Sequence, residues 1–430
     1  MKLSNIRTEE RGAQTALVAD VGSAKFRKGD FAEKTIWISV PKEYGKYLTA
    51  DRYDAFLPAL LAPAMFCGDD IEIGGAVSKR LLRNINTYLL EVLKAYSPRL
   101  RGITIKAGET AGKPAISAGL NGTGFSGGVD SFCTIYENYA LENDPEYKIG
   151  ALLFLNVGAH GLYGRAETKQ RFENLFALLK PFPDSEGLPF VPVDSNFHFW
   201  FGREWCHAFV LPLTLAGGVL ALQKFFKRYY MASAGQNYDQ WTKYAPSERG
   251  HYLDGFAEPY LCPLLSTEST KFVLDGIRHS RVEKTLKIAG YPPAKRFLNV
   301  CLRKNPEIEN CGVCDKCKRT LLTLSAAGLL EDFGAVFNLG EFGRNRRDWI
   351  CGEVYNEKTG RHVRYEVFKD RGVWARSNYD PDMDAVLEFH RGRGVRLPTF
   401  LEAGAWLFWR KWFLPRVRDL YGKICGKTTR

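Results

Sequence analysis

The residues with the clearest chemical potential form a glycine-containing turn at positions 126–131. The turn reads Ser126-Gly127-Gly128-Val129-Asp130-Ser131. Two successive glycines let the backbone curl so that consecutive N–H groups point toward one anion, and a helix that begins there adds the positive end of its dipole. The serine hydroxyls can donate to the same anion, and Asp130 can orient Mg²⁺ or cap the helix. The turn therefore predicts a loop for the phosphates of ATP, and the alternative is an ordinary glycine turn at a helix N-terminus.

A cysteine cluster provides a second chemical signal. Four of the ten cysteines lie close together in the sequence, at Cys301, Cys311, Cys314 and Cys317. Two overlapping Cys-x2-Cys steps with a fourth thiolate nearby form a tetrahedral cage for Zn²⁺, and a full set of four ligands is typical of a structural site. An iron–sulfur cluster or disulfides are the alternatives. Because no signal peptide precedes the cluster, we expect a reducing, cytoplasmic setting.

Basic residues around the cysteines would offset the charge of four thiolates on one Zn²⁺. They are Arg303, Lys304, Lys316 and Lys318.

Together, the two motifs resemble a known family. The turn resembles the PP-loop of the N-type ATP pyrophosphatases, and its combination with Cys-x9-Cys-Gly-x-Cys-x2-Cys resembles the 7-cyano-7-deazaguanine synthase-like (QueC-like) proteins over about residues 122–324. The resemblance implies an adenine nucleotide alpha hydrolase-like fold in which residues 126–131 bind the pyrophosphate part of ATP. It further implies that ATP is cleaved between its α- and β-phosphates and that AMP is attached to an oxygen of the substrate.

The resemblance is uneven along this span. The matches to the family pattern are Gly158, His160, Glu167, Ser233–Gln236, Pro263–Leu265 and Arg319. The departures are Leu211–Thr214 and Tyr244–Arg249, where the family builds its deazaguanine pocket. We therefore expect retained ATP chemistry with an altered acceptor pocket. His160, at a predicted strand end, is a candidate general acid/base or substrate contact, although a lone histidine is more often structural.

These motifs predict an ATP-dependent adenylating enzyme of the C–N ligase type. It would use Mg-ATP to activate a carboxylate or amide oxygen of a small-molecule or nucleotide-like acceptor, and a nitrogen nucleophile would then displace AMP. One alternative is a PP-loop enzyme that modifies tRNA or another nucleic acid. The other is a non-catalytic nucleotide-binding sensor or scaffold.

The elements that must position the loop alternate between strand and helix. Strands are predicted at about 150–157, 190–194 and 228–234, with helices at about 165–180 and 207–227. Such alternation predicts a doubly wound parallel sheet, in which ligands bind at the carboxyl ends of the strands. The turn, His160 and residues 235–237 all fall at such ends.

Length and composition predict more than one domain. A chain of 430 residues with 45% hydrophobic residues suggests a small N-terminal α/β domain at 1–115, the PP-loop domain with its zinc site at 116–330, and a basic aromatic region at 331–430. The first could present substrate, mediate a homodimer or form a lid. The net charge of +12 indicates an acidic partner such as a nucleotide, a nucleic acid or an anionic membrane. The longest uncharged run, Ala208–Leu222, is too short to span a membrane and predicts a buried helix.

The C-terminal region concentrates aromatic residues around two bases at Ala405–Leu414. Three interpretations compete. Such a segment can stack on single-stranded nucleic acid, or lie as a helix at a membrane interface. It can also pack its aromatic side on the protein and leave the bases in solvent.

Overall fold

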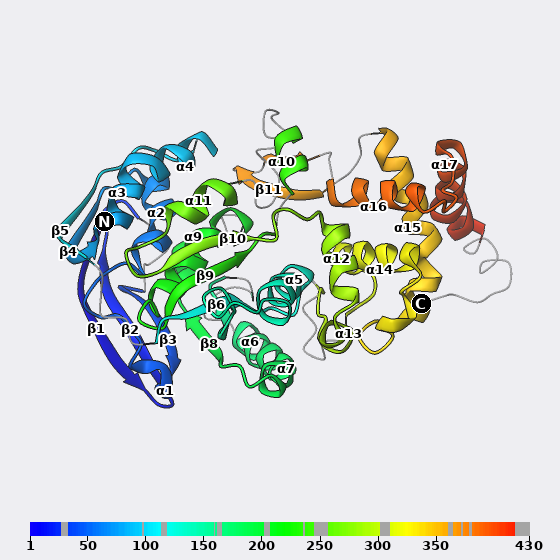
Figure 1. Ribbon diagram of the computed structural model, residues 1–430. Coiled ribbons are helices and arrows are strands. Elements are labelled where there is room, and N and C mark those ends of the chain that lie inside the picture. The colour runs from blue at the N-terminus through cyan, green and yellow to red at the C-terminus, as the bar shows by residue number, and fades with distance from the viewer. Residues whose placement is uncertain are drawn as a thin grey trace. The chain divides into compact units, whose positions relative to one another are not determined.

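The computed structural model shows an α/β unit and a helical unit (Figure 1). It describes residues 1–26, 33–96, 99–112, 118–158, 160, 166–201, 207–234, 237–244, 257–301, 310–359, 364–370, 373–377 and 381–417. The first compact unit is Met1–His279 with Val367–Trp374, and the second is Ser280–Glu366 with Ala375–Arg430. This division differs from the boundaries expected at 115/116 and 330/331.

A single ten-stranded mixed sheet forms the first unit, in the order β10-β9-β6-β7-β8-β3-β2-β1-β4-β5. The strands are β1 (Lys2–Arg11), β2 (Gln14–Gly22), β3 (Thr35–Pro41), β4 (Ile71–Ser78), β5 (Ile105–Ala111), β6 (Leu120–Gly124), β7 (Ala151–Asn156), β8 (Phe190–Ser195), β9 (Phe226–Ala232) and β10 (Lys271–Asp275). The unit is of the α/β class and its sheet is mostly parallel, as the alternation of strands and helices in the sequence predicts.

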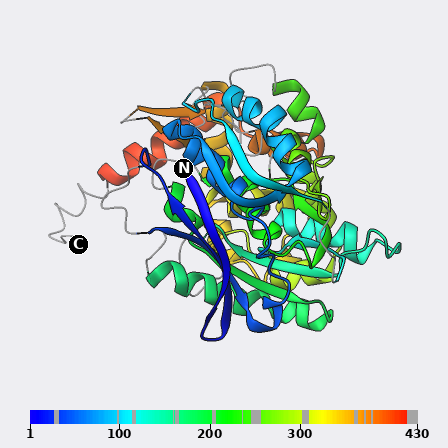
Figure 2. The same ribbon diagram turned by 90° about the vertical axis from the view of Figure 1, so that its left-hand side faces the viewer.

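The N-terminal strands continue the sheet of the loop-bearing strands. The β1–β2 hairpin is the long dark-blue ribbon in Figure 2. Strand β3 joins this hairpin to β8 by antiparallel pairing. The fully buried Asn196 extends this pairing of β3 with β8. Its side chain accepts a hydrogen bond from the Trp37 N–H and donates one to the Thr35 carbonyl, both at 2.8 Å. The region expected as a separate domain at 1–115 therefore shares one sheet with the loop.

The parallel half of the sheet has a doubly wound strand order. The chain enters at the central strand β6, proceeds outward through β7 and β8, and then returns to β9 and β10 on the other side of β6. The strand order thus reverses between β6 and β9, and the crevice outside such a switch point is where open α/β sheets bind ligands. Gly122 allows this pairing, because a Cβ there would lie 2.2 Å from the Phe226 ring.

Helices cover both faces of this parallel half (Figure 1). On one face lie α5 (Val129–Ile135), the π-helical turn η2 (Tyr136–Ala140), α6 (Ala166–Leu179) and α7 (Pro181–Ser185). Rings from both the strands and these helices, including Phe125, Phe132 and Phe154, pack into one aromatic layer beneath them. On the other face lie α2 (Leu57–Cys67), α9 (His207–Leu220) and α11 (Glu258–Leu264).

Helix α9 is the buried helix predicted from the long uncharged run. Its residues Leu213, Ala216 and Val219 are fully buried. A Cβ at Gly217 would lie 2.6 Å from the carbonyl oxygen of Ala55, so glycine permits close packing beside α2. Within the part of the chain that the structure describes, no helix has both the length and the apolar character needed to cross a bilayer.

The remaining helices of the first unit are short. They are α1 (Lys42–Gly45), α3 (Lys79–Asn84), η1 (Ile85–Leu89), α4 (Leu90–Tyr96), α8 (Phe197–Phe201) and α10 (Tyr238–Tyr244). A separate two-stranded sheet pairs β11 (Arg364–Asp370) with β12 (Val373–Ser377).

The second unit is built from helices. They are α12 (Arg281–Ala289), α13 (Pro292–Phe297), α14 (Asp315–Ala327), η5 (Glu331–Phe333), α15 (Leu339–Thr359), α16 (Pro381–Gly392), α17 (Phe400–Phe408) and η6 (Trp409–Phe413). Helices α12, α14 and α16 pack against one another, and α17 packs against α15.

Candidate functional site

The glycine turn connects β6 to α5 at the carboxyl end of the central strand. Gly127 has a φ of 74°, in the left-handed region where a side chain would strain the backbone. Gly128 is extended and is the N-cap residue of α5. The turn therefore needs glycine at its second position, and it directs the start of α5 toward the switch point between β6 and β9.

The first backbone amides of the turn have no hydrogen-bond acceptor among the described residues. The first backbone hydrogen bond of α5 runs from the Phe132 N–H to the Gly128 carbonyl, at 3.0 Å. Among the described residues, the N–H groups of Gly127, Gly128 and Val129 donate no hydrogen bond, as is usual for the first amides of a helix. These three donors, next to the positive end of α5, can hold a phosphate group.

The polar side chains of the turn lie around these amides. The Ser131 hydroxyl donates to the Gly128 carbonyl at 3.0 Å, and the Ser126 and Ser131 hydroxyl oxygens are 3.5 Å apart. Ser126 is exposed, Ser131 is buried, and Asp130 is half-buried in the first turn of α5. All six residues predicted to bind ATP thus belong to one short loop.

The neighbouring strand β9 ends in a second loop at the same edge of the sheet. Ser233 N–H donates to the Asp275 carbonyl at 2.8 Å, and Ala234 N–H donates to the Glu258 carboxylate at 3.2 Å. Asn237 caps α10 by accepting from Gln240 N–H at 2.9 Å. Gly235, Gln236 and residues 245–256 lie outside the described residues.

His160 follows β7 and lies in the aromatic layer. Its buried ring is 5.1 Å from the Phe154 ring and 5.4 Å from the Phe172 ring, measured between centroids. This packing is typical of a structural histidine, and the role of His160 in catalysis stays a prediction.

Two polar residues that sequence reasoning missed lie at the carboxyl ends of β7 and β8. The Asn156 side-chain amide donates to Asp194 at 2.7 Å, and Ser195 N–H donates to the same carboxylate oxygen at 2.9 Å. Burial raises the pKa of Asp194 above its ordinary value, although these two hydrogen bonds oppose the shift. The signal that the sequence offered for this pair was an aspartate, Asp194, at the end of a predicted strand.

An arginine and a histidine lie beyond the carboxyl end of β10. Glu137 of η2 accepts from Arg278 at 2.8 Å and from the His279 ring at 2.9 Å. The hydrogen bond with Glu137 raises the pKa of Arg278, so its exposed guanidinium stays charged. The proximity of these residues to η2 depends on tertiary structure, so the sequence did not indicate it.

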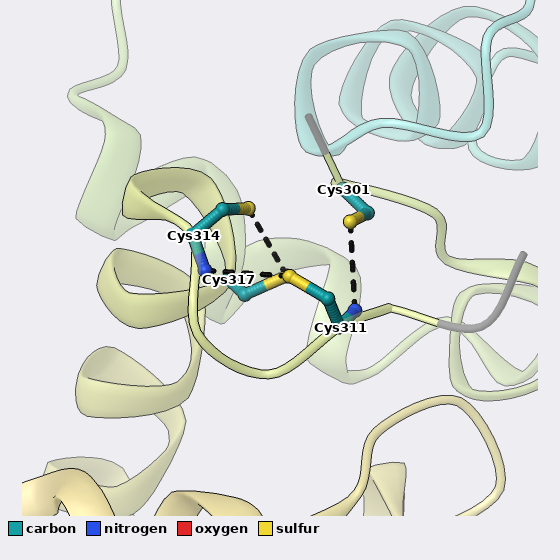
Figure 3. A group of neighbouring side chains, drawn as sticks. All are labelled: Cys301, Cys311, Cys314 and Cys317. Atoms are coloured by element: carbon teal, nitrogen blue, oxygen red, sulfur yellow. Dashed lines mark hydrogen bonds between the residues drawn. The ribbon is translucent and has the colours of Figure 1, made fainter. Parts of the chain in front are cut away.

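The four cysteines predicted to bind metal come together in the second unit (Figure 3). Cys314 is the N-cap of α14 and Cys317 lies in its first turn, while Gly312 has a φ of 68° that turns the chain between Cys311 and Cys314. The four sulfur atoms lie within 4.8 Å of one another.

The geometry fits a single tetrahedral ion. The Cys317 sulfur is 3.5 Å from that of Cys314 and 3.9 Å from that of Cys311. Zn–S bonds of about 2.3 Å in a tetrahedron require sulfur atoms about 3.8 Å apart. An iron–sulfur cluster would place at least some of the sulfurs further apart, because its four thiolates are divided among two or more irons. The group can therefore hold a metal ion such as zinc.

Backbone N–H groups within the cluster donate hydrogen bonds to two of the cysteine sulfurs. Cys314 N–H donates to the Cys311 sulfur at 3.3 Å, and Cys311 N–H donates to the Cys301 sulfur at 3.5 Å. Hydrogen bonds with Cys301 and Cys314, together with burial, raise the pKa of Cys317. A metal ion coordinated by the Cys317 sulfur would displace the proton of that thiol.

A buried asparagine that sequence reasoning missed positions the segments that carry the cysteines. The Asn310 side chain accepts from Val300 N–H at 2.7 Å and donates to the carbonyls of Leu298 at 2.7 Å and Val336 at 2.9 Å. It thereby fixes the residues just before Cys301 and Cys311.

Lys318, which was predicted to offset the thiolate charge, forms ion pairs with two carboxylates. Its ammonium group lies 2.5 Å from Glu353 and 3.4 Å from Asp315. Burial would lower the pKa of Lys318, but these carboxylates outweigh it and raise the pKa. Lys318 is thus one positive charge shared between two carboxylates. Arg303 and Lys304 lie outside the described residues.

Comparison of this chain with protein-family models, with curated proteins and with solved structures gives no match in any of the three.

Proposed function

We propose that this protein is a PP-loop enzyme, QueC-like in its chemistry, that uses Mg-ATP to adenylate an oxygen of its acceptor. The observation that carries the proposal is the position of the turn at residues 126–131. It lies at the carboxyl end of the central strand, next to the switch point, and has amides without partners among the described residues. In sheets of this strand order, that position is where nucleotides bind.

Each loop residue has a role in the proposed reaction. The amides of Gly127, Gly128 and Val129, with the hydroxyl groups of Ser126 and Ser131, bind the β- and γ-phosphates. The helix dipole of α5 stabilises the charge of the departing pyrophosphate.

The reaction then proceeds in two transfers. A carboxylate or amide oxygen of the acceptor attacks the α-phosphorus, the bond to the bridging oxygen breaks, and pyrophosphate leaves with that electron pair. A nitrogen nucleophile next attacks the activated carbon and displaces AMP. Bound Mg²⁺, for which Asp130 is the candidate ligand in the loop, would supply charge neutralisation on the phosphates. The protein contributes mainly orientation of the reacting groups.

The cysteine group has a structural role in this proposal. With four protein ligands, a bound zinc would have no open position for substrate. Its binding energy would contribute to the folding of the second unit.

Nucleotide products provide the test. The full-length protein is incubated with ATP labelled at the α-phosphate, Mg²⁺ and a small-molecule extract of its own cells, and the nucleotides are separated. We expect AMP and pyrophosphate with the wild type and a loss of at least about a hundredfold with Asp130→Ala. Asp184→Ala is the matched control, because Asp184 lies in the first turn of α7, away from the strand ends, and pairs with Lys180.

The other outcomes separate the alternatives. ADP as the product, or tight ATP binding without turnover, would overturn adenylation, and the latter would favour a nucleotide sensor. Failure to bind ATP would overturn both.

A further inference from the structure

The C-terminal helix of the second unit has two apolar faces. Helix α17 begins with a capping box between Thr399 and Glu402, and it continues through η6 to residue 417. Its inner face packs on α15. Ala403 is fully buried, and the Trp406 indole N–H donates to Asp348 at 2.7 Å.

The opposite face carries large apolar side chains that the described structure leaves exposed. Their exposed fractions are 79% for Leu401, 59% for Phe408, 44% for Trp409, 56% for Trp412 and 52% for Phe413. The spacing i, i+7, i+8, i+11, i+12 places them along one side of a helix. We call these five residues the exposed stripe. The interpretation in which the aromatic side packs on the protein is therefore wrong for four of the aromatics, and it holds for Trp406.

Positive charge accompanies the stripe. Lys411 and Arg416 are exposed on the same helical segment, whereas Arg410 pairs with Asp348 at 3.2 Å. Residues 391–430 contain ten Lys or Arg and two Asp or Glu. An apolar stripe with tryptophan and flanking bases is the pattern of a helix that lies in the headgroup region of an anionic bilayer.

We propose that residues 400–417 form an interfacial helix that seats the exposed stripe in the surface of an anionic lipid bilayer. The helix lies along the membrane plane, because its inner face remains packed on α15. Its bases contact the lipid phosphates, and its apolar side chains enter the acyl boundary. This function is independent of the adenylation proposed above.

Ring stacking within the exposed stripe favours a bilayer over single-stranded nucleic acid as its binding partner. The Phe408 and Trp412 rings are stacked with centroids 5.8 Å apart, and the Arg416 guanidinium lies 3.0 Å from the Trp412 centroid. Because Phe408 precedes Trp412 by one helical turn and Arg416 follows it by one, they cover opposite faces of the indole. Bases stack on open ring faces, whereas lipid insertion uses ring edges and aliphatic side chains such as Leu401.

Vesicle flotation tests this proposal on the full-length chain. The probes are vesicles of phosphatidylcholine alone and vesicles with about one third phosphatidylserine, for which each base near the surface strengthens binding about fivefold. We expect flotation with the anionic vesicles. The double substitution Phe408→Ser and Trp412→Ser should weaken binding by at least about tenfold. Tyr88→Ser is the matched control, since Tyr88 is a similarly exposed aromatic in η1. Circular dichroism verifies that each variant is folded.

A measurement on the wild type keeps the proposal falsifiable if the double variant does not fold. Brominated lipids should quench the tryptophan fluorescence of the bound protein, because Trp409 and Trp412 enter the bilayer. Absence of vesicle binding, binding without quenching, or binding unchanged by the double substitution would overturn the proposal. It would also be overturned if that substitution abolished binding to single-stranded RNA or self-association, with no effect on vesicles.

Discussion

The guanidinium of Arg319 lies 2.6 Å from the carboxylate of Asp382, and both side chains are buried. Arg319 follows Cys317 by two residues on α14, and Asp382 lies in the first turn of α16. Arg281 of α12 adds a second positive charge 3.7 Å from the same carboxylate. Burial alone would raise the pKa of Asp382, but the two arginines outweigh burial and hold it below the ordinary value. The Asp382 carboxylate thus links α14, which carries Cys317 and is capped by Cys314, to α12 and α16 of the same unit.

The first prediction concerns this pair. Asp382→Ala should lower the unfolding free energy of the second unit by about 3–5 kcal/mol, because it leaves buried positive charge without its partner. Because the pKa of Asp382 is depressed in the folded state, the wild-type contribution is present above the ordinary carboxyl pKa and is lost as pH falls through the depressed value. Chemical denaturation of both proteins measures it. Asp315→Ala is the control, since Asp315 is exposed, and a cost for Asp382→Ala as small as that of the control would contradict the prediction.

Asp54 should give the opposite pH dependence. This fully buried carboxylate accepts from Ser78 N–H at 2.7 Å and from the Gln223 amide at 3.0 Å. Burial raises its pKa from 3.8 to about 6. The folded state therefore binds this proton more tightly than the unfolded state, so the contribution of Asp54 to stability is full below pH 3.8 and is lost as pH rises through about 6.

The substitution Asp54→Asn isolates that contribution. The difference in unfolding free energy between wild type and variant should shift against the wild type by roughly 3 kcal/mol as pH rises through this window. Urea unfolding at several pH values between 4 and 7 measures it, a range set by the two pKa values. A difference that stays constant over this range would refute the assignment.

Metal content tests the cysteine group. The purified protein should contain about one zinc per chain, and Cys314→Ser should remove most of it, since three sulfur ligands bind far more weakly than four. Elemental analysis provides the measurement. Cys67→Ser is the control, because Cys67 lies outside the group of four. Removal of zinc by a chelator should also lower the thermal stability of the second unit. Equal zinc content in the two variants would rule out this site.

Substitution of two glycines that share a backbone conformation distinguishes an effect on ATP binding from an effect of backbone strain. Gly127 and Gly187 have φ values of 74° and 66°, but Gly127 lies in the candidate loop and Gly187 precedes β8. Alanine at either position should cost about 1–2 kcal/mol of stability. Only Gly127→Ala should also weaken ATP binding, by about tenfold or more, as measured by calorimetry. Equal ATP affinities in the two variants would argue against the loop.

The sequence alone was sufficient for features that depend on local spacing. The six residues at 126–131 form the loop that opens α5, the four cysteines come together, and Ala208–Leu222 contains a buried helix. Each of these features is set by neighbours within a few residues of one another, because glycine conformation, the Cys-x2-Cys step and helical periodicity are local properties.

Tertiary structure decided what local patterns do not encode. Strands β1 and β2 were not predicted, since polar residues such as Arg7 and Asp20, 2.9 Å apart, interrupt their apolar pattern. The pairing of β3 with β8 joins residues more than 150 positions apart, which no local signal records. Exposure of Trp412 and partial burial of Trp406 likewise depend on where α15 packs. Amino-acid type and spacing therefore determined the chemistry available to this protein, whereas long-range pairing and packing decided which of those side chains reach solvent, an ion or a ligand.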